Sequence, residues 1–339
     1  MCIHGGDIYR NHINIDFSIS VNPLGIPESV KMALHNAVKF CDKYPDIRAE
    51  KLKKAVSKMC DVPEEYLLFG NGASELFMAA SHAIKANKTI IPVPTFYGYE
   101  YAAMAAGSKV FYYQVSRSDN FYLTENINNI LTKDVGLIFL ANPNNPTGVL
   151  LDKETVKSIL KHCRDREIYV VLDESFIEFC GSRFSMLSEI EEFDNLILVR
   201  TFTKIFSIPG VRLGYLICKN YALLTKIARQ LSEWNLSCFA QEAGCACALQ
   251  TNFVKETETY IKKERCFLED GLRQKGFLVF PSTANFILIY SDKPLYEKLL
   301  EKGILIRDCT NFRGLSKGFY RIAVKGRNEN KVLLREIGD

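Results

Sequence analysis

Six short apolar runs alternate with amphipathic segments between residues 47 and 245, and this alternation constrains the fold more than any other feature. The apolar runs, which we expect to be strands, cover residues 89–93, 110–115, 135–141, 168–173, 196–200 and 212–218. Apolar residues at three-to-four spacing predict helices over residues 74–85, 97–106, 153–166 and 221–233. Several strand runs are almost continuously apolar, as in strands buried on both faces. The pattern predicts an α/β fold with a doubly wound, mostly parallel sheet.

The last third of the chain has a different pattern. An amphipathic stretch at residues 254–275 precedes strand-like runs at 285–290, 304–307 and 320–324, which predict a smaller α+β domain. The opening segment is punctuated by proline and glycine, and we expect it to cross back onto that domain. We therefore predict an N-terminal segment at 1–46 associated with the small domain, a large domain at 47–245 and a small C-terminal domain at 246–339.

Composition excludes several classes of function. The net charge is only +4 and basic residues form no long run, so binding to nucleic acid has no electrostatic support. Eleven scattered cysteines without a Cys-x-x-Cys pair argue against a zinc site or a disulfide framework, and we expect no metal. No apolar stretch reaches the length of a membrane span, and the first residues do not resemble a signal peptide. We expect a cytoplasmic protein with reduced thiols and no membrane partner.

One lysine is placed for chemistry. Lys204 ends the run TFTK at residues 201–204, directly after a predicted strand, and Arg212 follows it within PGVRLGY. Upstream, the strand at 168–172 ends on Asp173, and residues 142–148 read NPNNPTG. A loop after a strand can present an amine to the crevice at the strand ends, which suits a cofactor with a carbonyl group.

These three motifs, in this order, resemble the fold-type I pyridoxal 5'-phosphate (PLP) enzymes of the aminotransferase superfamily. The resemblance covers essentially the whole chain and implies the PLP-dependent transferase fold, with its active site between two domains. It implies that Lys204 is the catalytic lysine, which holds the cofactor aldehyde as a Schiff base. It also implies that Asp173 keeps the ring nitrogen of the cofactor protonated. A plain helix cap is the other reading of Asp173.

Further cofactor contacts follow from the same resemblance. The amide of Asn145 is expected to donate to the cofactor O3', and Phe96 to stack on its ring, although Asn145 also suits a turn and Phe96 a core. A glycine-rich helix start offers an anion site for the cofactor phosphate. The residues expected to hold that phosphate are Gly72, Ala73, Ser74, Thr201, Thr203 and Arg212. Tyr44 matches a tyrosine that family members donate to the partner subunit's cofactor phosphate, which implies a homodimer with shared sites.

Two arginines indicate the substrate class. Arg321 matches the arginine that binds the substrate carboxylate in this superfamily, and Arg307 matches a second arginine found where the substrate carries a phosphate. The resemblance thus implies a small phosphorylated amino-acid substrate. His4 and Asn22 are further candidates for contacts with its phosphate or carboxylate.

Two subfamilies fit these features, histidinol-phosphate aminotransferase and threonine-phosphate decarboxylase. The opening HGGD at residues 4–7, the segment SVNP at 20–23 and Phe176, where the aminotransferase commonly has tyrosine, resemble the decarboxylase more closely. That subfamily converts O-phospho-L-threonine to (R)-1-aminopropan-2-yl phosphate for cobalamin biosynthesis. A histidinol-phosphate aminotransferase or another class I/II aminotransferase is the alternative, and a scaffold with this fold but no activity is a third.

The two reactions differ in which bond at the substrate Cα stands perpendicular to the cofactor ring. A site that places the carboxylate there favours decarboxylation, whereas an arginine that holds the carboxylate in the ring plane favours proton transfer through Lys204. Sequence alone leaves this orientation open.

Overall fold

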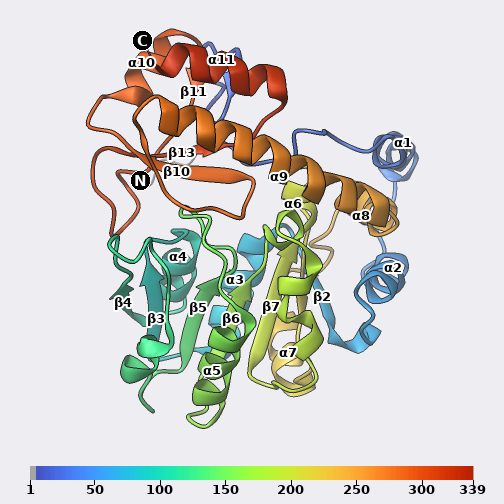
Figure 1. Cartoon of the computed structure of the whole chain (residues 1–339). Helices are drawn as coiled ribbons and strands as arrows, with labels where there is room; N and C mark the ends of the chain where they lie inside the picture. Colours follow the sequence, from blue (N-terminus) through green and yellow to red (C-terminus); the bar gives the residue numbers. More distant parts are fainter. Residues whose placement is uncertain (1–4, 339) are drawn as a thin grey trace.

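The computed structural model describes residues 5–338 as a large sheet packed between helices, with two smaller sheets at its upper end (Figure 1). The strands are β1 (Ile15–Asp16), β2 (Leu67–Gly70), β3 (Lys88–Val93), β4 (Lys109–Gln114), β5 (Leu137–Ala141), β6 (Tyr169–Asp173), β7 (Leu196–Thr201), β8 (Gly214–Ile217), β9 (Leu278–Val279), β10 (Phe286–Tyr290), β11 (Ile304–Leu305), β12 (Arg307–Asp308) and β13 (Phe319–Ala323). The α-helices are α1 (Glu28–Ala37), α2 (Glu50–Cys60), α3 (Ala73–Ile84), α4 (Gly98–Ala105), α5 (Lys153–Arg164), α6 (Phe202–Ile205), α7 (Tyr221–Ala228), α8 (Cys238–Ala248), α9 (Thr251–Gln274), α10 (Leu295–Glu301) and α11 (Arg327–Ile337).

The large sheet has seven strands in the order β2-β8-β7-β6-β5-β3-β4. Strands β7, β6, β5, β3 and β4 pair in parallel, whereas β8 runs antiparallel to both of its neighbours. The prediction of a mostly parallel sheet is therefore confirmed, with β8 as the exception. The strand expected at 212–218 begins only at Gly214, because Arg212 has a positive φ of 60° and cannot continue an extended strand.

Alternate residues of the central strands enter two separate cores, which explains why these strands read as continuous apolar runs. On β5, Ile138 and Leu140 join one cluster while Leu137 and Phe139 join the other. Helices α2, α5 and α8 contribute to the first cluster, and α3, α4 and α7 to the second. The sheet is thus covered by helices on both faces.

The smaller sheets lie beyond one end of the large one (Figure 1). Strands β12, β13, β10 and β9 form one of them in that order, and β1 pairs in parallel with β11 to form the other. Strand β1 therefore brings the opening segment to this part of the molecule. The single strand predicted at 304–307 is wrong, because its two halves belong to different sheets: Ile304–Leu305 pairs with β1 and Arg307–Asp308 with β13.

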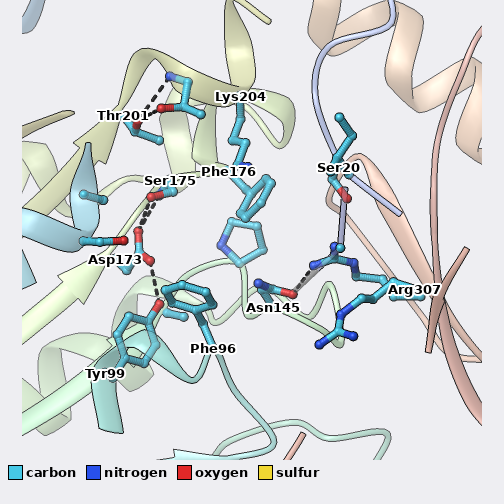
Figure 2. A pocket seen from close by; sticks show the side chains of 18 of the residues that line it. Ser20, Phe96, Tyr99, Asn145, Asp173, Ser175, Phe176, Thr201, Lys204 and Arg307 are labelled. Carbon is cyan, nitrogen blue, oxygen red and sulfur yellow. Dashed lines mark hydrogen bonds between the residues drawn. The ribbon is translucent and has the colours of Figure 1, made fainter. Parts of the chain in front are cut away.

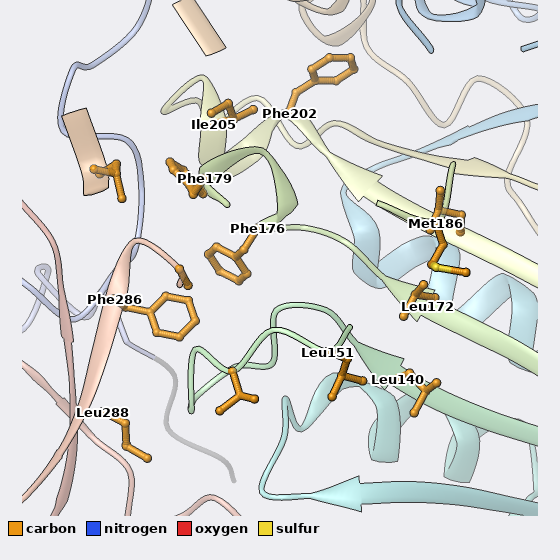
Figure 3. Close-up of a cluster of buried hydrophobic side chains, with 14 of the residues drawn as sticks. Leu140, Leu151, Leu172, Phe176, Phe179, Met186, Phe202, Ile205, Phe286 and Leu288 are labelled. Carbon is orange, nitrogen blue, oxygen red and sulfur yellow. The ribbon is translucent and has the colours of Figure 1, made fainter. Parts of the chain in front are cut away.

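Apolar packing joins the two parts of the chain. Phe176, which follows β6, and Phe286 on β10 meet edge to face with their ring centroids 5.0 Å apart (Figure 3). Both rings belong to one continuous buried cluster that extends from the large sheet into the small ones. Such pairs add to the free energy that area burial alone provides, so this contact helps to fix the small sheets over the large one.

None of the helices within residues 5–338 combines the length and the apolar character that a membrane span requires.

A buried ion pair ties the end of β6 to β7. Glu174 is fully buried and accepts from Arg200 Nε at 3.0 Å and Nη2 at 2.8 Å. The same carboxylate accepts from the Ser185 hydroxyl and the Met186 amide, each at 2.7 Å. A buried charge is tolerated only when its hydrogen-bonding capacity is filled, as it is here. The pair therefore helps to set the positions of the adjacent residues, which are Asp173 before Glu174 and Thr201 after Arg200.

Removing one partner of this pair should destabilise the fold strongly. We expect Glu174→Ala to lower the free energy of unfolding by about 3–5 kcal/mol, because it leaves the Arg200 guanidinium buried without its counter-charge. Urea unfolding followed by circular dichroism measures this loss. The exposed pair of Lys31 and Glu28, 3.2 Å apart, provides the control, and Glu28→Ala should have a much smaller effect. A loss for Glu174→Ala no larger than that of the control contradicts the prediction.

Candidate active site

The carboxyl ends of β5, β6 and β7 open into a cavity of about 400 Å³. Ala141 of β5 pairs with Asp173 of β6, and Asp173 pairs with Val199 of β7, so the residues that follow these strands emerge side by side. In Figure 2, Asp173 and Thr201 lie at one side of the cavity, Ser20 and Arg307 at the other, and Lys204 between them. The predicted site residues that line it are Ala73, Ser74, Phe96, Asn145, Asp173, Thr201, Thr203, Lys204, Arg212, Arg307 and Arg321.

Asp173 is held by three hydrogen-bond donors. Its Oδ1 accepts from the Ser175 amide at 2.8 Å and the Ser175 hydroxyl at 2.5 Å, and its Oδ2 accepts from the Tyr99 hydroxyl at 2.5 Å. Burial raises the pKa of Asp173, and the bonds from Ser175 and Tyr99 oppose that rise. A buried carboxylate of this kind favours a cation beside it. The protonated ring nitrogen of PLP is such a cation.

Lys204 has an amine suited to covalent chemistry. It lies in the short helix α6, and its Nζ is 6.0 Å from the centre of the Phe176 ring. Burial, together with the positive charges of Arg321 and Arg212, lowers the pKa of Lys204 to about 8. An amine with this pKa is largely neutral in mildly alkaline solution and can act as a nucleophile or a base.

An anion site lies where α3 begins. Gly72 precedes the helix with a φ of 80°, and a Cβ there would lie only 2.4 Å from Arg212 Nη2, so this position requires glycine. Thr201 accepts from the Thr203 amide at 3.1 Å and donates to the Leu213 carbonyl at 2.8 Å. Free amides at a helix start beside a guanidinium attract a phosphate group.

The opposite end of the cavity holds two neighbouring arginines. Arg307 and Arg321 are partners across β12 and β13, and both are buried. Burial and the positive charge of Arg307 lower the pKa of Arg321 to about 10. Two buried guanidinium groups side by side repel each other unless an anion lies between them, so this end suits a carboxylate or phosphate.

Asn145 connects the arginines to the centre of the cavity. Its Oδ1 accepts a hydrogen bond from Arg321 Nη1 (Figure 2). The bond sets the orientation of the amide and leaves Nδ2 as the donor toward the cavity. This orientation is the one that the predicted contact with the cofactor O3' requires.

Asn22 differs from its predicted place, because it does not line the cavity. Its side chain is buried and donates to the Ile205 carbonyl and the Thr257 hydroxyl, both at 2.8 Å, while its backbone amide donates to the Lys204 carbonyl at 3.0 Å. We therefore replace the expected substrate contact with a structural role, in which Asn22 supports the turn that carries Lys204.

The structure leaves two other predicted contacts untested. His4 is outside the described residues. Tyr44 is 82% exposed and packs against Trp234, with ring centroids 5.0 Å apart. Its predicted contact with a partner subunit stays a prediction.

Several residues at the cavity were missed from sequence. Tyr99 and Ser175 bind Asp173, and Ser18 and Ser20 line the wall near the arginines. Tyr99 could have been suspected, because it follows the expected stacking residue Phe96 by only three positions, and the two rings are in contact. The serines carried no such signal, since serine is common in turns and loops without any role in a site.

Taken together, these residues fit PLP. The amine of Lys204 can bond to the aldehyde, Asp173 can pair with the ring nitrogen, and the start of α3 with Arg212 can bind the phosphate. Phe96 lines the cavity beside Tyr99, its ring centroid 5.6 Å away, and can cover the ring face. Arg307 and Arg321 are then left to bind the substrate.

Comparison with known proteins agrees with this geometry. A family model described as aminotransferase class I and II matches residues 12–337. The chain is 36% identical to a putative threonine-phosphate decarboxylase of Caldanaerobacter subterraneus subsp. tengcongensis, over 98% of this chain and 92% of the relative. It is 32% identical to the threonine-phosphate decarboxylase of Salmonella typhimurium, over 94% and 89%. The solved structure of the histidinol-phosphate aminotransferase from Clostridium acetobutylicum matches with a TM-score of 0.90 at 34% identity, covering 96% of this chain and 98% of that one.

The lowered pKa of Lys204 predicts how cofactor uptake depends on pH. Only the neutral amine reacts, so the rate at which the apoprotein takes up PLP should rise about tenfold per pH unit below pH 8 and level off above it. Stopped-flow absorbance measures this rate, with N-acetyl-lysine as the reference for the ionisation of PLP itself. Arg321→Ala should move the midpoint to higher pH, and Arg321→Lys, which keeps the charge, should not. A rate that continues to rise to pH 10 contradicts the prediction.

Proposed function

This chain belongs to the aminotransferase class I and II family, and from that premise we propose that it decarboxylates O-phospho-L-threonine. The product is (R)-1-aminopropan-2-yl phosphate, and the cofactor is PLP. Two relatives that align over nearly the whole chain are named as threonine-phosphate decarboxylases, one of them as putative, which supports this choice within the family. The reaction would supply a phosphorylated amino alcohol to cobalamin biosynthesis.

The observation that carries the proposal is the position of Arg307 and Arg321. Both line the same cavity as Lys204. Both are buried, and they lie on paired strands of a small sheet. A substrate bonded through its amine near Lys204 would bring a second anionic group to these arginines. A phosphorylated amino acid carries both the amine and such an anionic group.

The residues of the chain divide the chemical work. When bound, PLP supplies an aldehyde that bonds to amines and a ring that accepts the electron pair of a broken bond at the substrate Cα. Asp173, fixed by Tyr99 and Ser175, holds the proton on the ring nitrogen. Lys204 Nζ holds the aldehyde before substrate arrives and afterwards delivers a proton to Cα. Arg321 and Arg307 bind the anionic end of the substrate and so fix its orientation.

Phe176 supports decarboxylation over transamination. It lines the cavity next to Lys204, where the aminotransferase subfamily commonly has tyrosine, and a phenyl ring offers no hydroxyl to the cofactor. The amide of Asn145 then remains as the predicted side-chain donor to the cofactor O3'. Histidinol-phosphate aminotransferase is the second candidate, because the enzyme of that kind from Clostridium acetobutylicum has a similar structure, with a TM-score of 0.90.

Product analysis tests the proposal. With O-phospho-L-threonine, the purified enzyme loaded with PLP should release carbon dioxide and aminopropanol phosphate in equal amounts and form no 2-oxo acid. Lys204→Ala should lower the rate at least about a hundredfold, because the proton-transfer group is lost, whereas the partly exposed Lys302→Ala should not. Formation of glutamate from histidinol phosphate and 2-oxoglutarate, without carbon dioxide from phosphothreonine, identifies the aminotransferase instead.

We further propose that two copies of this chain form a dimer with shared sites. Large apolar side chains are exposed within one short segment, at Met32, Val38, Phe40, Tyr44 and Ile47. Such a concentration is unusual on a surface that faces only water. The exposed guanidinium of Arg212 at the mouth of the cofactor phosphate site fits a tyrosine contributed by a partner.

Mixed dimers test the sharing of sites. Tyr44→Ala should weaken PLP binding about tenfold through loss of one charge-assisted hydrogen bond, and Lys204→Ala should be inactive. Co-expression of the two variants should give mixed dimers whose active site binds PLP with wild-type affinity, because that one site then has both residues intact. Light scattering after gel filtration measures the mass of the assembly. Phe40→Glu should give monomers, whereas Leu278→Glu, at an exposed site on β9, is the control and should leave the dimer intact. Mixed dimers whose active site keeps the weakened PLP affinity of Tyr44→Ala contradict sharing.

Two expectations about the whole chain remain proposals. The division at residues 46 and 245 is supported by how the strands divide between sheets. Strands β2 to β8 form the large sheet, whereas β1 and β9 to β13 form the small sheets. A cytoplasmic location is supported by the ten cysteines within residues 5–338, which all carry free thiols.

A further inference from the structure

Two buried polar atoms beside the arginines have no hydrogen-bond partner among the described residues. They are the Ser20 hydroxyl and Arg321 Nε. Ser20 is only 2% exposed, and both residues line the active-site cavity. A buried polar atom without a partner is costly, so such atoms at a cavity wall indicate a ligand that completes them.

The segment that carries Ser20 is fixed on both sides. The Ser18 carbonyl accepts from Arg321 Nη2 at 2.8 Å, and the Ser20 carbonyl accepts from Asn285 Nδ2 at 3.0 Å. Asn285 is fully buried and directly precedes β10. The hydroxyl of Ser20 is therefore attached to a backbone that is already held in place, and a ligand can bind it without first ordering the chain.

The chemistry of the two atoms determines what completes them. Arg321 Nε can only donate, and a serine hydroxyl can donate as well, so both are satisfied by an acceptor between them. Two adjacent guanidinium groups favour an acceptor that carries a negative charge. An anionic oxygen of the substrate would complete both atoms.

The position in the cavity distinguishes the two anionic groups of the substrate. In Figure 2, Ser20 lies on the side of Arg307, away from Asp173 and Thr201. The carboxylate is attached to the same carbon as the reacting amine, whereas the phosphate is two bonds further out. We propose that the Ser20 hydroxyl donates a hydrogen bond to the substrate phosphate, an inference that rests on the proposed function, and so helps to select phosphorylated amino acids.

Steady-state kinetics of Ser20→Ala in the PLP-loaded enzyme test this role. The KM for O-phospho-L-threonine should rise about 10- to 100-fold, as for the loss of a hydrogen bond to a charged group. The kcat should change little, because the bond is made in both the ground and transition states. Calorimetry should show a similar loss of affinity for inorganic phosphate in the holoenzyme, where the cofactor already occupies the Arg212 end. The affinity for L-threonine, measured from the visible absorbance, should stay unchanged.

Matched variants control for indirect effects. Ser81→Ala removes another buried hydroxyl without a partner among residues 5–338, on α3 but not among the residues that line the cavity, and should leave these constants unchanged. Ser20→Cys has nearly the same size and a poor donor, so it should weaken phosphate binding even if the alanine variant does not fold.

Two results overturn the role of Ser20. One is a KM and phosphate affinity for both Ser20 variants within twofold of the wild type. The other is an equal loss of affinity for L-threonine, which would assign the hydroxyl to the carboxylate. A wild-type enzyme that releases no carbon dioxide contradicts the proposed reaction instead, and the titration with inorganic phosphate still tests Ser20.

Discussion

The parallel register of β5, β6 and β7 is the constraint on which the site depends. Because Ala141, Asp173 and Val199 are neighbours across the three strands, the chain segments that follow them emerge at one edge of the sheet. One carries Asn145, one is Asp173 itself, and one carries Lys204. A shift of β6 by a single residue would turn Asp173 toward the opposite face of the sheet. The buried pair of Glu174 and Arg200 opposes such a shift, since it links the same two strand ends.

Positive charge is the second organising feature of the cavity. Lys204, Arg212, Arg307 and Arg321 all line it, and Asp173 is its acidic member. Burial and this excess of positive charge lower the pKa values of Lys204 and Arg321. The site therefore suits both a neutral amine and anionic ligands. The two anion-binding ends lie on opposite sides of Lys204. A cofactor phosphate at one end and a substrate phosphate at the other would balance the charge while placing the reacting carbon near the lysine.

Residues that come directly at the end of a recognisable strand could be located from the sequence. Residues whose role depends on partners from a distant segment could not. Lys204, Asp173 and Asn145 follow strands that are recognisable by their apolar runs, and all three line the cavity. Asn22 was misplaced because its partners, Ile205 and Thr257, are distant in sequence. Ser20 was missed for the same reason, since its environment depends on Arg321 and Asn285, about three hundred residues away.

By itself, the sequence determined the class of fold, the family and the cofactor chemistry, because strand periodicity and motif order are local properties that survive without coordinates. The tertiary structure alone decided how the small sheets meet the large one. It divided residues 304–307 between two sheets, and it brought Arg307 and Arg321 together over the strand ends. It also left the Ser20 hydroxyl buried without a partner. These features depend on packing and desolvation between distant segments, and no local pattern of residues encodes which buried groups will face each other.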